Sequence, residues 1–338
     1  MSITLRPFVP KAEQNAKDEA PVKSAKENLL VPLAKTFADL LRTPLQPRKR
    51  ILGNWLFQGD LGAIVASRGS GKTWVTMLIA KAISTAAPMG TWDGPDEPLR
   101  VGIFDSEMAP EDLHGRAQAC GLDGLESLLL LSYSDILQAR RRPLNLADAD
   151  DHELLLGWAR EAKLDVLIVD NITTATSGIS ENDNSDFRDK IQPLFLGARA
   201  MGLTFITVGH AGRNGCWRGA SAKEDLLDWT LLLARDDESE DDKLVLKSSF
   251  GKFRRSRDGN PPLKWTISAQ AGEPIQVHSE SYSGPDAMLS MVGAGIGQPS
   301  QLAEELGVSG GTISKWAKKL IDSGRLKKTG RSEYALNT

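Results

Sequence analysis

The sequence is poor in cysteine and in long apolar runs, and each shortage excludes a class of protein. Only two of its 338 residues are cysteines, Cys120 and Cys216, which lie far apart and without metal-ligand spacing. This usage excludes a disulfide framework and indicates a reducing, cytoplasmic environment. No run approaches the roughly 18 apolar residues of a membrane helix, and the first residues lack the form of a signal peptide. We therefore expect no membrane association.

The chain also has little net charge. Its formal charge of −3 excludes a generally basic surface, so any binding of nucleic acid depends on local clusters of Lys and Arg. Hydrophobic residues make up 41% and charged residues 25%, which is typical of globular proteins. The length fits one large domain and one small one.

What the chain does contain is a glycine-rich loop between an apolar strand and a helix. The loop runs Ala66-Ser-Arg-Gly-Ser-Gly-Lys-Thr73, with Ala66 where the strict pattern has glycine. Its glycines let backbone N–H groups turn toward a phosphate, and the following helix adds the positive end of its dipole. Lys72 can reach the β- and γ-phosphates, and the Thr73 hydroxyl can ligate Mg²⁺. We expect a nucleoside triphosphate to contact Ser67, Arg68, Gly69, Ser70, Gly71, Lys72, Thr73 and Trp74.

Three further apolar strands end in polar residues that suit the same site. Asp170 ends one of them and can hold Mg²⁺ through water, opposite Thr73. Glu107 follows another and can act as general base toward the attacking water, while the orientation of nearby Asp105 stays open. His210 ends the third, where it either senses the γ-phosphate or makes a structural hydrogen bond.

Strands and helices alternate over most of the chain, which predicts an α/β fold with a mostly parallel central sheet covered on both faces. The expected strands are 62–66, 100–105, 128–132, 165–170 and 203–209. The expected helices are 71–87, 110–120, 151–162 and 186–201. Shorter strands follow, and we expect them to extend the sheet in antiparallel pairing: 229–234, 244–249, 263–268 and 274–278.

The order of these motifs resembles the RecA-fold P-loop ATPases, and within them the plasmid RepA-type and DnaB-type hexameric replicative helicases. The resemblance covers residues 46–280. It implies ATP as nucleotide, Glu107 as catalytic residue, Asp170 as magnesium ligand and His210 as sensor. It also implies a ring, usually of six subunits, in which Lys252 with Arg254 or Arg255 serves the ATP of the next subunit. A solvated or DNA-binding basic loop is the alternative for these cations.

Basic residues elsewhere suggest contacts with nucleic acid. In a ring of this kind the loops 171–186 and 211–222 line the pore, and the cations of the second are Arg213, Arg218 and nearby Lys223. These loops are alternatively mobile connections. Arg140, Arg141 and Arg142 are interpreted as an exposed face, and the acidic run 236–242 as a solvated loop.

The two ends of the chain carry separate signals. Residues 1–28 are expected as a disordered arm, followed up to residue 45 by a short amphipathic helix that packs on its own chain or on a neighbouring subunit. A linker is expected at 281–296. Residues 297–338 then resemble a winged helix-turn-helix, with helices at 299–306 and 312–322 and a hairpin turning at Gly330.

The second helix of this last domain predicts binding of duplex DNA. Its expected buried stripe is Ile313, Trp316, Leu320 and Ile321, which leaves Lys315, Lys318 and Lys319 facing outward, and the hairpin adds Lys327 and Lys328. The sequence thus favours an ATP-driven, ring-shaped helicase that moves along single-stranded DNA in replication of a plasmid, phage or mobile element. The alternative is a non-motor ATPase switch, a recombination mediator or replication regulator whose nucleotide state controls assembly on DNA.

Overall fold

The computed structural model describes residues 30–179, 183–212, 225–240, 242–255, 259–269, 273–282, 284–306, 308–330 and 333–337. The chain divides into two units, Met1–Pro47 and Arg48–Thr338. In the first unit a 3₁₀ turn, η1 (Val31–Leu33), precedes helix α1 (Phe37–Arg42). The expected arm at 1–28 lies outside the described residues.

Helix α1 is shorter than expected and keeps its apolar side chains exposed. The Thr36 side chain caps it by accepting a hydrogen bond from the Asp39 N–H, and it ends at Thr43, before Pro44. Phe37 and Leu41 are each 84% exposed.

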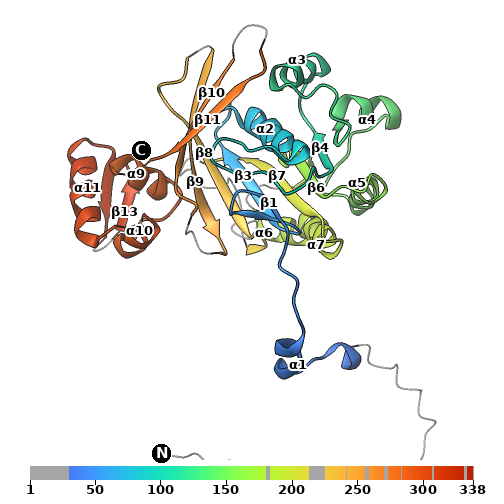
Figure 1. The fold of residues 1–338 in the computed structure, drawn as a ribbon, viewed down its shortest axis with the longest axis horizontal. Coiled ribbons are helices and arrows are strands. Elements are labelled where there is room, and N and C mark those ends of the chain that lie inside the picture. Colours follow the sequence, from blue (N-terminus) through green and yellow to red (C-terminus); the bar gives the residue numbers. More distant parts are fainter. Residues whose placement is uncertain are drawn as a thin grey trace, which may run out of the picture. The chain divides into compact units, whose positions relative to one another are not determined.

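In the second unit, one sheet contains nine strands of the described ranges, in the order β11-β10-β9-β8-β3-β7-β6-β4-β5 (Figure 1). Strands β8, β3, β7, β6, β4 and β5 pair in parallel, as the alternating pattern predicts, and β9, β10 and β11 extend the sheet antiparallel. Their bounds are β3 Leu61–Ala66, β4 Val101–Asp105, β5 Leu128–Ser132, β6 Val166–Asp170, β7 Thr204–His210, β8 Trp229–Arg235, β9 Lys243–Phe253, β10 Leu263–Ser268 and β11 Gln276–Ser281.

The strand expected at 229–234 as antiparallel is antiparallel to β9 but not to its other neighbour. Strand β8 pairs in parallel with β3, its Gly62–Trp229 register bringing the Trp229 ring directly over the strand. A Cβ on Gly62 would lie 2.0 Å from that ring, so the close approach requires glycine here. A small two-stranded ribbon, β1 (Arg50–Leu52) and β2 (Leu56–Phe57), was not expected at all.

Both faces of the central strands β3, β4, β6 and β7 are buried because these strands are apolar at successive positions. In β3, Ile64 and Ala66 pack with α2 (Lys72–Thr85) on one face, whereas Ala63 and Val65 pack with α5 (Ala149–Glu161) and α7 (Gln192–Ala200) on the other. The remaining helices near the sheet are α3 (Pro110–Cys120), α4 (Tyr133–Arg140) and α6 (Asn184–Asp186), the last continued by a π-helical turn, η2 (Phe187–Ile191). The single helix expected at 186–201 is therefore interrupted.

The C-terminal part of this unit has its own apolar core. Helices α9 (Pro285–Gly293), α10 (Pro299–Glu305) and α11 (Gly310–Asp322) pack with the hairpin β12 (Leu326–Thr329) and β13 (Glu333–Leu336). The segment 281–296 is thus not a linker: α9 lies within it and buries Met288 and Met291 in this core.

Helix α11 begins at the Ser309 cap, and its buried stripe differs from the expected one. Ile313, Ala317 and Leu320 are buried, whereas Ile321 is 39% exposed and Trp316 is half-buried. The change follows from the helical repeat, since Ala317 lies four residues after Ile313 on the same face. None of the helices in the described part of the chain combines the length and the apolar run needed to cross a membrane.

Candidate nucleotide-binding site

The glycine-rich loop joins the carboxyl end of β3 to the amino end of α2. Gly69 (φ +69°) and Gly71 (φ +93°) adopt the left-handed conformation that favours glycine, and Gly71 is the residue before the first turn of α2. The Ser70 hydroxyl donates to the Ser67 carbonyl oxygen at 2.7 Å and fixes the loop. The N-terminus of α2 therefore faces the space above the loop, as a phosphate site requires.

Lys72 lies in this space beside His210. Its Nζ is 3.0 Å from the Ser67 carbonyl oxygen and 3.2 Å from His210 Nδ1, and the side chain is largely buried. Burial lowers the pKa of Lys72, while Asp170 and Glu107 nearby act to raise it. The end of β7 thus brings His210 into contact with the phosphate-binding lysine, where a sensor would have to be.

Asp170 and Thr73 lie side by side at the position where the sequence predicts a Mg²⁺ site. The two side chains are hydrogen-bonded, and burial raises the pKa of Asp170 to about 6. Its Oδ2 is buried and has no hydrogen-bond partner in the described part of the chain. An acceptor oxygen left in this state fits a metal ion or its water. Among the described residues there is no cluster of three or more His, Cys, Asp or Glu side chains that could hold a metal ion.

Glu107 is held beside this carboxylate by two neighbours. Asn171 Nδ2 donates to Glu107 Oε2 in a short hydrogen bond. Asp105 Oδ1 accepts from the backbone N–H groups of Glu107 (3.1 Å) and Met108 (2.7 Å). Asp105 therefore shapes the turn that presents Glu107, which decides the orientation that the sequence left open. Asn171 was missed, although its place directly after Asp170 was the available signal.

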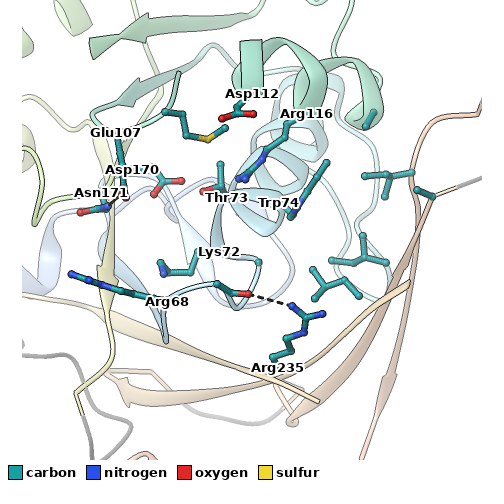
Figure 2. Close-up of a pocket in the computed structure, with 18 of the residues that line it drawn as sticks. Arg68, Lys72, Thr73, Trp74, Glu107, Asp112, Arg116, Asp170, Asn171 and Arg235 are labelled. Atoms are coloured by element: carbon teal, nitrogen blue, oxygen red, sulfur yellow. Dashed lines mark hydrogen bonds between the residues drawn. The ribbon is translucent and has the colours of Figure 1, made fainter. Parts of the chain in front are cut away.

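These groups line a cavity of about 900 Å³ (Figure 2). The Arg116 guanidinium lies 5.4 Å from the ring centroid of Trp74, and Arg235 Nη1 donates to the Gly69 carbonyl oxygen at 3.4 Å. Leu244, Ile267 and Ile275 form an apolar wall. The cavity thus joins a phosphate end to an apolar region with room for a nucleobase. Arg116 and Arg235 were not expected, since neither lies near a motif in the sequence.

Comparison with known proteins agrees with this geometry. A protein-family model described as an AAA domain matches residues 26–215, more than half of the chain. The chain belongs to this family of P-loop ATPases. The mostly parallel sheet around the loop confirms the expected RecA-like α/β class. A search of curated proteins found no match. Strands β8–β11 and the C-terminal core follow residue 215 and lie outside the match to the AAA domain.

In the chemistry of P-loop ATPases, each of these cavity residues would have a distinct role. Bound Mg²⁺ would neutralise phosphate charge and would be held by Thr73 directly and by Asp170 through water. Lys72 would supply a second positive charge at the phosphates. Glu107, held by Asn171, would accept a proton from the attacking water. The structure brings these residues together from the start of α2 and from the ends of β4 and β6.

Lys252, Arg254 and Arg255 lie far from this cavity. Phe253 of β9 pairs with Trp229, which pairs with Gly62 near the start of β3, whereas the phosphate loop follows the end of β3. Four residue steps of β3, about 13 Å, separate Gly62 from Ala66, and the phosphate loop lies beyond Ala66. The basic segment therefore cannot reach the ATP of its own subunit.

Only some of the residues expected to contact nucleic acid lie in the part of the chain that the structure describes. Arg213, Arg218 and Lys223 lie outside the described residues. Lys315, Lys318 and Lys319 are exposed on α11, and Lys327 and Lys328 are exposed on β12. Arg140 and Arg142 do not form a free basic face, because both bind the buried carboxylate of Asp151, at 2.7 and 3.0 Å. The interpretation of this cluster as an exposed face holds for Arg141 and Arg142, which are exposed, whereas Arg140 is half-buried.

We expect Asp170→Asn to stabilise the nucleotide-free AAA-domain protein by about 2–3 kcal/mol at pH 8. The folded-state pKa of Asp170, about 6, lies above the ordinary 3.8, so ionisation of this carboxylate costs stability in the folded state. The cost is fully present above the folded pKa and disappears below about pH 4. Chemical denaturation at pH 5 and pH 8 measures it, and the gain must be larger at pH 8.

A matched control for this prediction is Asp112→Asn, since Asp112 lines the same cavity but is exposed. It should change stability little at either pH. An Asp170→Asn variant that is no more stable than the wild type at pH 8 would contradict the claim that ionised Asp170 destabilises the folded protein.

Proposed function

We propose that this AAA-domain ATPase works as a ring, usually of six subunits, that hydrolyses ATP and moves along single-stranded DNA as a replicative helicase. The observation that carries the proposal is the position of Lys252 and Arg254. They occupy the edge of the sheet opposite the phosphate loop of their own chain. Cations at that edge can serve ATP only when it is bound to another copy.

The C-terminal core supports a second contact, with duplex DNA. Helix α11 presents Lys315, Lys318 and Lys319 on its exposed face and packs its apolar face on α9 and α10. This arrangement suits a winged helix-turn-helix with α11 in the major groove. Phosphate contacts from these lysines would position the protein on DNA.

The C-terminal core with its exposed lysines also favours a second candidate function, a nucleotide-controlled switch. A motor on a single strand does not require a module for duplex DNA, whereas a recombination mediator or replication regulator does. In that case ATP would control assembly on DNA, and hydrolysis would reset it. The two candidates share ATP, Mg²⁺ and self-assembly but differ in how DNA affects turnover.

The deciding experiment measures ATP hydrolysis by the full chain alone, with single-stranded DNA and with duplex DNA. We expect single-stranded DNA to raise kcat at least about tenfold, because a motor couples the strand in its pore to the active site. Duplex DNA should bind with strong dependence on salt. Hydrolysis unchanged by single-stranded DNA, together with tight duplex binding, would replace the motor with the switch.

A further inference from the structure

Two buried carboxylates gather four arginines at the edge of the sheet opposite the phosphate loop. Asp60 precedes β3 and Asp228 precedes β8, and both are buried. The arginines come from distant parts of the chain: Arg48, Arg199, Arg254 and Arg255. Burying two carboxylates is costly unless each is paired, so this cluster requires an explanation.

Asp60 holds Arg255 inside its own chain. Arg255 Nη2 forms an ion pair with Asp60, its Nη1 donates to the Trp55 carbonyl oxygen at 3.1 Å, and its guanidinium lies 4.6 Å from the Phe57 ring centroid. Arg48 donates to the same Asp60 oxygen at 2.9 Å. With its guanidinium packed over the Phe57 ring and only 21% of its side chain exposed, Arg255 is a structural residue.

Asp228 holds Arg254 differently. Its Oδ2 accepts from the Leu61 backbone N–H (2.9 Å) and from Arg199 (2.7 Å), which fixes the carboxylate. Its Oδ1 lies 3.6 Å from Arg254 Nη1. The Asp225 carbonyl oxygen accepts from Arg254 Nη2, and the Arg254 backbone N–H donates to the Asp228 carbonyl oxygen at 2.9 Å. Arg254 is thus oriented from the protein side, while 45% of its side chain remains exposed.

We propose that Asp228 is a positioning residue, which orients Arg254 toward the ATP of the next subunit, while Asp60 retains Arg255 as a structural anchor. The inference rests on the proposed function, since it needs an active site shared between subunits. A pre-oriented cation stabilises developing charge without the cost of ordering a free side chain at the moment of reaction. It also assigns the role of arginine finger to Arg254 alone.

The test uses co-expressed, differently tagged pairs of variants purified as mixed assemblies. Asp228→Asn alone should lower kcat at least about tenfold with KM changed less than about threefold, since the finger acts on the transition state. Mixed with Lys72→Ala, it should recover activity. In such an assembly the phosphate loop of an Asp228→Asn subunit meets the intact Arg254 of a Lys72→Ala subunit. A defect of folding in the Asp228→Asn subunit could not be rescued in this way.

Two reference mixtures separate the possible failures. Arg254→Ala with Lys72→Ala should also recover activity, and its failure would overturn the shared site and with it both the proposed function and this inference. Recovery there, without recovery for Asp228→Asn, would overturn this inference alone. Asp151→Asn is the matched structural control, because Asp151 is equally buried and binds two arginines away from this edge. It should lose stability without a defect that Lys72→Ala rescues.

Asp228→Glu covers the case in which Asp228→Asn does not fold. It keeps the charge for Arg199 but displaces the carboxylate by one methylene group, so it should show the same rescuable loss of kcat. Full activity of a folded Asp228→Glu or Asp228→Asn variant would overturn the positioning role.

Discussion

Replacing Lys72 with alanine should lower the rate of ATP hydrolysis by about 100- to 1,000-fold while leaving the fold intact. The Lys72 ammonium is largely buried between the Ser67 carbonyl oxygen and His210, at the N-terminus of α2. It is therefore held where phosphate charge would develop and cannot be replaced there by a solvent cation. Steady-state hydrolysis and thermal unfolding of the same preparation measure the two parts of this prediction.

The control for Lys72→Ala is Lys49→Ala. Lys49 forms an exposed ion pair with Glu97 at 3.1 Å, and such pairs contribute about 0–1 kcal/mol. We expect neither stability nor hydrolysis to change in this variant. Normal turnover in folded Lys72→Ala would show that the glycine-rich loop is not part of the active site.

Glu107→Gln should retain ATP binding and lose turnover by about 10²- to 10⁴-fold. Glutamine has the size of glutamate and still offers Asn171 an acceptor oxygen, so the hydrogen bond and the turn shaped by Asp105 remain possible. What it lacks is a carboxylate that can take a proton from water. Calorimetric titration with ATP and single-turnover hydrolysis separate binding from chemistry.

Glu111→Gln is the matched control here. Glu111 is an exposed residue in the first turn of α3, four positions after Glu107, and does not line the cavity. It should bind and hydrolyse ATP like the wild type. If Glu107→Gln also turned over at the wild-type rate, the general base would have to be sought elsewhere in the cavity.

The sequence predicted the parts of this structure that depend on local patterns. The phosphate loop, α2 and the strand ending at Asp170 are each specified by neighbouring residues, as are the Ser309 cap and α11. The same holds for gathering Lys72, Glu107, Asp170 and His210, because carboxyl ends of parallel strands meet at one edge of a sheet.

Features that depend on long-range contacts were not predictable. The direction of β8 is set by its pairing with β3, which no residue within the strand encodes. Helix α9 was hidden by its glycine- and serine-rich surroundings, although Met288 and Met291 fill the C-terminal core. The ion pairs of Arg140 and Arg142 were missed because their shared partner, Asp151, lies farther along the chain.

Strand β3 carries the phosphate loop at one end, while the anchors of Arg254 and Arg255 gather around its other end. In the proposed assembly each subunit therefore offers one edge to the neighbour on one side and the opposite edge to the neighbour on the other. Contacts of this kind are heterologous, and repeating them gives either a closed ring or an open helix. Such an assembly has two different faces, so it has an intrinsic direction, which movement one way along a strand requires.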